Sequence, residues 1–151
     1  MDRSRIVSTS RSIKAPAATV FELIADPARQ PEWDGNGNLH SAAPGQRVRS
    51  AGDVFVMTLT HDHAVRENHV VEFEEGRLMA WRPSEVGGPQ PGHLWRWEVE
   101  PQSDGCLVTH TYDWSELTDE SRFKRAESTS VAALAASLDR LAARAEATVR
   151  H

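Results

Sequence analysis

Apolar and polar residues alternate through most of residues 38–114, the pattern of strands in a half-buried sheet. Short stretches rich in turn residues separate the alternating segments, which predicts an antiparallel meander. The clearest strands are expected at residues 53–60, 64–73, 77–82, 93–100 and 106–114. A further strand is expected at residues 5–14, with weaker signals at 38–42 and 46–49, and residues 83–92 (PSEVGGPQPG) predict a long loop.

Helical spacing occurs near both ends of the chain. After Ala15-Pro16, Val20, Phe21 and Ile24 recur at helical intervals and predict a short helix to about Ala25. Asp26-Pro27 then predicts a second, brief helix, with Asp26 as its N-cap. Two short helices are therefore expected between the first strand and the meander.

The longest helical pattern lies in the last part of the chain. Its apolar residues fall on one face of a helix expected from about Glu127 to Val149. The segment 124–130 (KRAESTS) contains weak helix formers, so a break or bend is expected there. The residues of the apolar face are Val131, Leu134, Leu138, Leu141, Ala145 and Val149.

Length and composition indicate what these elements can build. A chain of 151 residues fits one domain over residues 1–151, in which the helix and the one-faced sheet bury each other. The net charge of -5 and the 17 scattered Lys and Arg residues indicate no nucleic-acid partner. A single cysteine, Cys106, and the absence of a long apolar run indicate no internal disulfide and no membrane insertion, so we expect a cytoplasmic protein.

Particular residues resemble a known family over essentially the whole chain. Near the N-terminus these are Ile13, Ala15-Pro16, Val20-Phe21, Asp26-Pro27, Arg29, Pro31 and Trp33. In the second half they are Trp95, Trp97 and residues 108–117, followed by the long helix. Together they resemble the START-like (SRPBCC) superfamily, which includes the Bet v 1 allergens, and within it the polyketide cyclase/dehydrase-like branch.

The resemblance implies an α+β helix-grip fold, in which a curved antiparallel sheet of six to seven strands surrounds the long C-terminal helix. It also implies an apolar cavity between sheet and helix that binds a hydrophobic small molecule such as a polyketide, a lipid or an aromatic compound. Only some members are enzymes, so a cyclase, aromatase or dehydratase is the alternative, and a protein-interaction or co-chaperone module is a third. We expect no cofactor and a monomer or homodimer.

Side-chain direction then selects candidate site residues. Alternate residues of a strand share a face, and we assign the bulkier set of each strand to the inside. This choice also places Glu67, His69, His110 and Tyr112 on the inside of the sheet. These residues can supply acid and base groups for a cyclisation or dehydration. The alternatives are a satisfied internal network, or a phase that is wrong by one residue and leaves them facing water.

The same assignment predicts an aromatic-rich wall for a ligand. The predicted ligand-binding residues are Phe55, Met57, Phe73, Met79, Trp81, Trp95, Trp97, Val131, Leu134 and Leu138. In residues 53–60 and 77–82 apolar side chains fall on both faces, so the phase there is open. His61 and His63 have a spacing that a metal ion can use, but their place in a turn favours solvent-exposed side chains, and we expect no metal.

Overall fold

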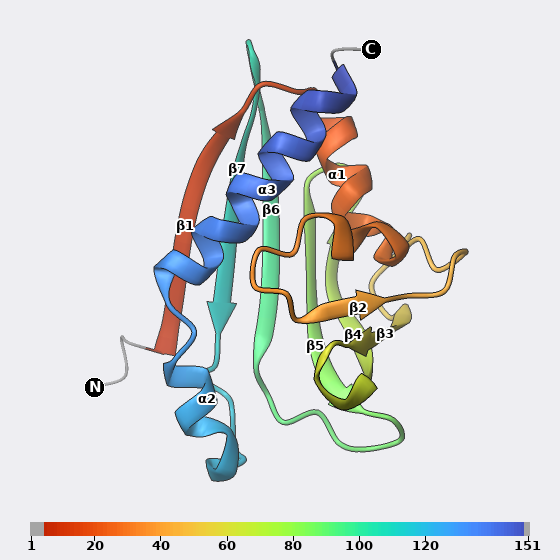
Figure 1. The fold of residues 1–151 in the computed structure, drawn as a ribbon, viewed down its shortest axis with the longest axis vertical. Helices are drawn as coiled ribbons and strands as arrows, with labels where there is room; N and C mark the ends of the chain where they lie inside the picture. The colour runs from red at the N-terminus through yellow and green to blue at the C-terminus, as the bar shows by residue number, and fades with distance from the viewer. Residues whose placement is uncertain (1–4, 150–151) are drawn as a thin grey trace.

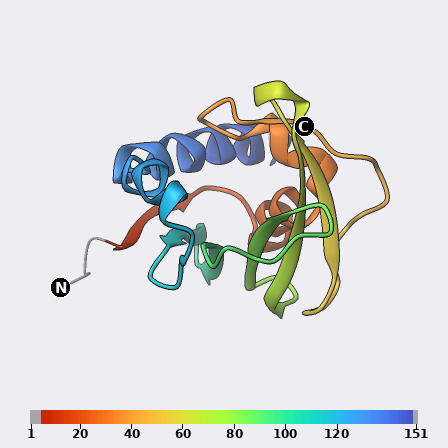
Figure 2. The ribbon, with the colours of Figure 1, turned by 90° about the horizontal axis from the view of Figure 1, so that it is seen from below.

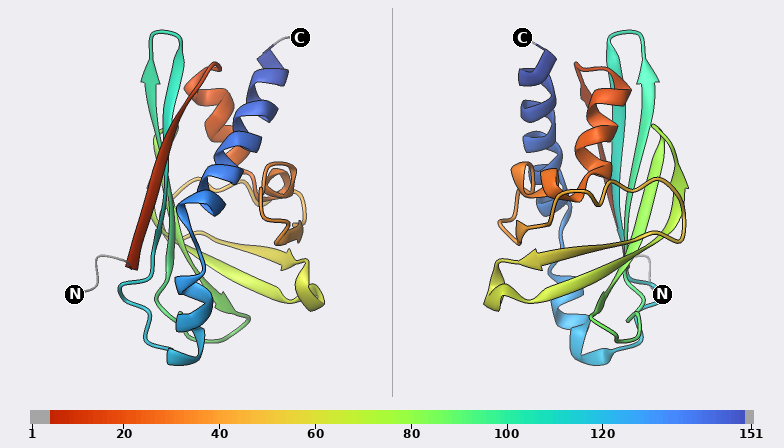
Figure 3. Two further views of the ribbon diagram at one scale, coloured as in Figure 1. Left: turned by 60° about the vertical axis from the view of Figure 1, so that its left-hand side comes forward. Right: turned by 90° about the vertical axis from the view of Figure 1, so that its right-hand side faces the viewer.

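The computed structural model of the protein describes residues 5–149. Within that range seven strands form one antiparallel sheet in the order β1-β7-β6-β5-β4-β3-β2. The sheet is strongly curved, and its concave side faces the helices (Figures 1 and 3). The strands are β1 (Ile6–Ile13), β2 (Leu39–Ser41), β3 (Val54–Leu59), β4 (Val65–Glu74), β5 (Leu78–Glu85), β6 (Leu94–Gln102) and β7 (Gly105–Asp113).

The helices form a layer over the concave side, and the long helix α3 lies across it (Figure 2). They are α1 (Ala17–Ala25), α2 (Phe123–Glu127) and α3 (Val131–Val149), with short 3-10 helices η2 (Pro27–Glu32), η3 (His61–His63) and η4 (Glu120–Arg122). The predicted α+β helix-grip architecture is confirmed. In the part of the chain that the structure describes, no helix is long and apolar enough to cross a membrane.

The predicted pair of short N-terminal helices is present. α1 buries Val20, Phe21 and Ile24 against the sheet, because they recur on one face of the helix. The carboxylate of Asp26 accepts a hydrogen bond from the Ala28 backbone N–H at 3.2 Å, which caps η2 as predicted. This pair leads the chain from the sheet edge back over the concave side.

The C-terminal helix is divided where the sequence is weakest. α2 ends at Glu127 and α3 begins at Val131, four residues later than the long helix expected from about Glu127. Ser130 caps the start of α3, because its hydroxyl accepts a hydrogen bond from the Ala133 N–H at 3.2 Å. The predicted break is confirmed, and it frees α2 to turn away from the axis of α3 (Figure 1).

Two strand predictions are wrong. Residues 46–49 form no strand, because the Gln46 side chain takes the place of a neighbouring strand and bonds both the N–H and the C=O of Val56, at 2.7 and 3.1 Å. β5 extends to Glu85, into the predicted loop. Pro83 is accommodated there because β5 pairs with β6 only as far as Trp81, so the missing N–H leaves no gap in a ladder.

The loop after η2 packs directly against α3. Gly35 lies so close to the helix backbone that a Cβ built on it would be 2.4 Å from the Ala136 carbonyl carbon. Its N–H donates to the Ser137 hydroxyl at 3.1 Å, and the Asn36 side-chain amide donates to the Ala133 carbonyl at 3.2 Å. These contacts fix α3 relative to η2 and β2.

We predict that Gly35→Ala lowers the free energy of unfolding by about 1–3 kcal/mol, because a methyl group has no space between two backbones. Urea denaturation followed by circular dichroism measures the loss. Gly88→Ala is the matched control, since its Cβ would be 3.4 Å from its closest neighbour, the Glu85 carbonyl oxygen. Equal stability of the two variants would contradict the prediction.

Candidate functional site

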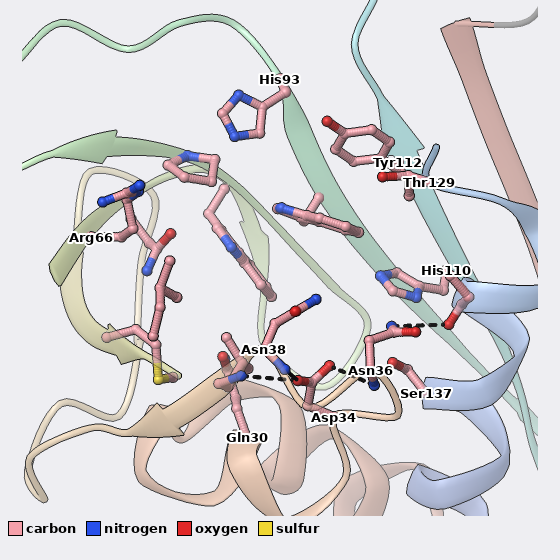
Figure 4. Close-up of a pocket in the computed structure, with 18 of the residues that line it drawn as sticks. Gln30, Asp34, Asn36, Asn38, Arg66, His93, His110, Tyr112, Thr129 and Ser137 are labelled. Carbon is pink, nitrogen blue, oxygen red and sulfur yellow. Dashed lines mark hydrogen bonds between the residues drawn. The ribbon is translucent and has the colours of Figure 1, made fainter. Parts of the chain in front are cut away.

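A cavity of about 430 Å³ lies between the concave side of the sheet and the helical layer. Its walls come from η2 and the loop after it, from strands β3 to β7, and from α2 and α3 (Figure 4). α3 contributes the small side chains of Ala133 and Ser137, which leave the space opposite the strands open. The volume lies within the range of ordinary small-molecule sites.

Paired aromatic side chains of β6 and β7 form one wall. Trp97 is opposite His110 in the sheet and stacks on it, with ring centroids 3.7 Å apart and planes 14° from parallel. Trp95 is opposite Tyr112, with centroids 4.3 Å apart. Trp33, in the loop after η2, packs edge-on against Trp97 at 5.0 Å. These cross-strand contacts hold a rigid, mostly apolar surface.

His110 is a deeply buried titratable group of this wall. Its side chain is 5% exposed, and its Nδ1 has no hydrogen-bond partner among residues 5–149. Burial lowers the pKa of His110 to about 3, and a hydrogen bond with the Leu134 backbone acts in the opposite direction. The imidazole is therefore neutral at neutral pH.

Tyr112 is neutral as well. Burial raises the pKa of Tyr112 to about 12, while the nearby Arg125 and Arg122 act to lower it. General acid–base groups work best with a pKa near the working pH, which neither side chain has. The wall therefore offers neutral hydrogen-bonding groups beside the aromatic rings.

Part of the cavity wall carries positive charge. We call this part the α2 rim and define it as Arg66, His93, Arg122 and Arg125. Burial is the largest cause that lowers the pKa of His93 to about 4, and the positive charges of Arg122, Arg125, Arg66 and Arg82 contribute to this shift in that order. His93 is thus neutral, and the positive charge of the rim lies on guanidinium groups.

Most of the sequence-predicted residues divide into two groups by position. Those on the cavity wall are Met57, Trp81, Trp95, Trp97, His110 and Tyr112. Those packed in or against the hydrophobic core, away from the wall, are Phe55, Phe73, Met79, Leu134 and Leu138. The inward direction expected for both groups is correct, and their roles toward a ligand stay predictions.

The inward direction predicted for Glu67 and His69 is wrong. Both lie on the outer face of β4: His69 Nε2 is 3.0 Å from the Ser84 hydroxyl, and the Glu67 carboxylate accepts a hydrogen bond from Gly87 N–H at 3.0 Å. Asn68 and Val70 point inward instead, at 5% and 2% exposure. A β-bulge between Val70 and Glu72 then reverses the phase, which is why Phe73 is inward as predicted.

The inward direction predicted for Val131 is also wrong. Val131 is 52% exposed and lies in the first turn of α3. The helix lines the cavity through Ala133 and Ser137. Neither stands out in the apolar pattern, since alanine is common in helices and serine is polar.

Several cavity residues were not identified from sequence. Gln30, Asp34 and Asn68 are buried polar residues of the wall, as is Ser137 of α3. For Asn68 the sequence contains a signal, because Asn68 alternates with Val70 on the face of residues 64–73 opposite the bulkier set. Arg122 and Arg125 lie in the weakly patterned segment before α3, where nothing in the sequence marks them.

The paired histidines of the β3–β4 turn are exposed. His61 Nε2 is 3.1 Å from the Asp62 carboxylate, and both side chains are 83% exposed. His63 packs edge-on against His40, with ring centroids 4.9 Å apart. Among residues 5–149 no group of three or more His, Cys, Asp or Glu side chains is placed to hold a metal ion.

A curved sheet that surrounds a long helix and leaves an aromatic-lined cavity beneath it defines a helix-grip protein of the START-like superfamily. The family model for polyketide cyclase/dehydrase and lipid transport matches residues 4–146, and the chain belongs to this family. Uncharacterized proteins of two Mycobacterium tuberculosis strains, H37Rv and CDC 1551, are each 32% identical over 111 residues. The match covers 72% of this chain and 47% of theirs, so the chain spans about half the length of these relatives.

Solved structures share the fold. A Nitrosomonas europaea protein superposes with a TM-score of 0.76 at 13% identity, covering 100% of both chains. A polyketide-cyclase-like protein of Corynebacterium glutamicum has a TM-score of 0.67 at 17% identity, covering 100% of this chain and 97% of its own. A major latex-like protein of Panax ginseng has a TM-score of 0.61 at 14% identity, covering 93% and 96%.

Burial of neutral His110 makes the stability sensitive to acid. Its folded-state pKa of about 3 is below the ordinary 6.5, so protons bind the unfolded chain first and stability falls as pH drops below about 6.5. We predict that protonation linked to His110 alone lowers the free energy of unfolding by about 2 kcal/mol between about pH 6.5 and about pH 4.5. Urea unfolding of the wild type and His110→Gln at several pH values measures it. The same pH dependence in both proteins would contradict the prediction.

Proposed function

We propose that this protein binds a hydrophobic small molecule of polyketide, lipid or aromatic type in the cavity between the sheet and α3. The observation that carries the proposal is a 430 Å³ cavity with the stacked rings of Trp95, Trp97, His110 and Tyr112 along one wall. Flat apolar surfaces with a few polar groups favour a ligand that is mostly apolar and still needs orientation. Membership of a family named for cyclases, dehydrases and lipid transport supports this class of ligand.

The cavity gives less support to a cyclase, aromatase or dehydratase. Such an enzyme on this scaffold needs an imidazole that exchanges protons with an acid or with Tyr112. His110 Nδ1 has no hydrogen-bond partner within residues 5–149, and burial makes it a weak base. His69 is on the outer face of the sheet, with Ser84 as its partner. Binding is therefore the function that we favour.

A neutral aromatic probe, 2-naphthamide, tests the proposal. The expected dissociation constant is about 1 mM or lower, the affinity that a probe of this size reaches in a preformed apolar site. Titration is followed by the indole N–H resonances of the five tryptophans in ¹H–¹⁵N spectra. The signals of Trp95 and Trp97 should shift, and that of Trp114, which lies outside the cavity wall, should not.

A variant that fills the cavity provides the control. Ala133 lies on the cavity wall, so Ala133→Phe should weaken binding at least about tenfold by occupying the space of the ligand. Ala143 is exposed on the same helix, and Ala143→Phe makes the same exchange on the solvent side without affecting binding. Absence of binding to the wild type, or equal affinity of the two variants, would contradict the proposal.

A further inference from the structure

The charge of the cavity wall differs in sign from that of the protein. The chain carries a net charge of -5, yet the wall contains Arg66, Arg122 and Arg125 against one acid, Asp34. A wall rich in cations on an acidic protein is a local arrangement that composition does not explain. A purely apolar ligand would make no use of this positive charge.

Asp34 does not neutralise these arginines. Its carboxylate accepts hydrogen bonds from the backbone N–H groups of Asn36, Asn38 and Leu39, at 3.4, 2.6 and 3.0 Å. Figure 4 shows it beside Asn36 and Asn38, on the side of the cavity away from His93. The Asp34 carboxylate therefore stabilises the loop after η2 through these hydrogen bonds and, within the described residues, forms no ion pair with the arginines of the wall.

Acids outside the wall neutralise only part of the cluster. Arg122 is 3.2 Å from Asp119 and 3.3 Å from Glu85, and Arg82, behind the rim, is 3.7 Å from Glu116. Within residues 5–149, neither Arg66 nor Arg125 forms an ion pair with a carboxylate. The Arg66 guanidinium donates only to the Val65 carbonyl, at 3.2 Å.

The two guanidinium groups that form no ion pair in the described part of the chain both line the cavity and both lower the pKa of the same side chain, His93. Arg66 belongs to β4 and Arg125 to α2, and both lie close enough to His93 to affect its proton affinity. Tyr112 on the aromatic wall is affected by Arg125 as well. The rim thus presents positive charge next to the rings on which an apolar ligand would lie.

We infer that the α2 rim binds an anionic group of the ligand through Arg66 and Arg125, which makes the ligand an amphipathic acid with an apolar or aromatic body. This inference rests on the proposed binding function. Guanidinium groups bind carboxylates and phosphates through directed, charge-assisted hydrogen bonds. The aromatic wall holds the apolar body while the rim fixes the acidic end.

The test compares three probes with the same ring system: neutral 2-naphthamide, 2-naphthoate and 2-naphthyl phosphate. Wild type should bind 2-naphthoate about tenfold more tightly than 2-naphthamide, the contribution of charge-assisted hydrogen bonds. Raising NaCl from about 0.05 M to about 0.5 M should weaken the binding of the two anions and leave the binding of the amide unchanged. Tighter binding of either anion than of the amide supports the inference, and their order identifies the anion as carboxylate or phosphate.

Two double variants complete the experiment. Arg66→Met with Arg125→Met should abolish the preference, so that this variant binds 2-naphthoate no more tightly than it binds 2-naphthamide. Arg77→Met with Arg140→Met removes the same charge outside the cavity wall and should retain the preference. An amide that binds wild type as tightly as both anions, or a preference that survives loss of Arg66 and Arg125, would overturn the inference alone. If no probe binds wild type, the proposed function fails with it.

Discussion

The close contact between the loop after η2 and α3 is the constraint on which the cavity depends. A helix placed on a concave sheet would otherwise settle until its side chains filled the space. Here the Gly35 backbone touches the helix backbone at Ala136, and the Ser137 hydroxyl and Ala133 carbonyl bond the loop. Because the Gly35 backbone lies directly against the helix backbone and two hydrogen bonds join the loop to α3, the helix has little freedom to shift.

The choice of side chains on α3 completes this arrangement. Toward the cavity the helix carries Ala133 and Ser137, whereas Leu138 and Leu141 on the same helix are buried in the core. Small residues thus leave space opposite the stacked rings, and large ones hold the helix to the sheet. The break between α2 and α3 lets α2 turn aside and bring Arg125 to the α2 rim.

Local patterns made part of this structure predictable. The Asp26 cap, the break before α3 and the alternation in β6 and β7 each depend on a few neighbouring residues. β4 was assigned the wrong phase because outward Val65 and Val71 are larger than inward Asn68, and a bulge is not visible in an alternating pattern. The arginine rim was not predictable, since Arg66 and Arg125 are far apart in sequence and line the same cavity only in the folded protein.

The central claim is that the cavity between the sheet and α3 binds an amphipathic acid, with the charged group of the acid at the α2 rim. A crystal structure of the protein grown with 2-naphthoate tests this claim most directly. We predict electron density for the naphthalene ring against Trp95 and Trp97, with the carboxylate directed toward Arg66 and Arg125. Density for the ring elsewhere on the protein, or α3 packed against Trp97 with no space between them, would contradict the claim.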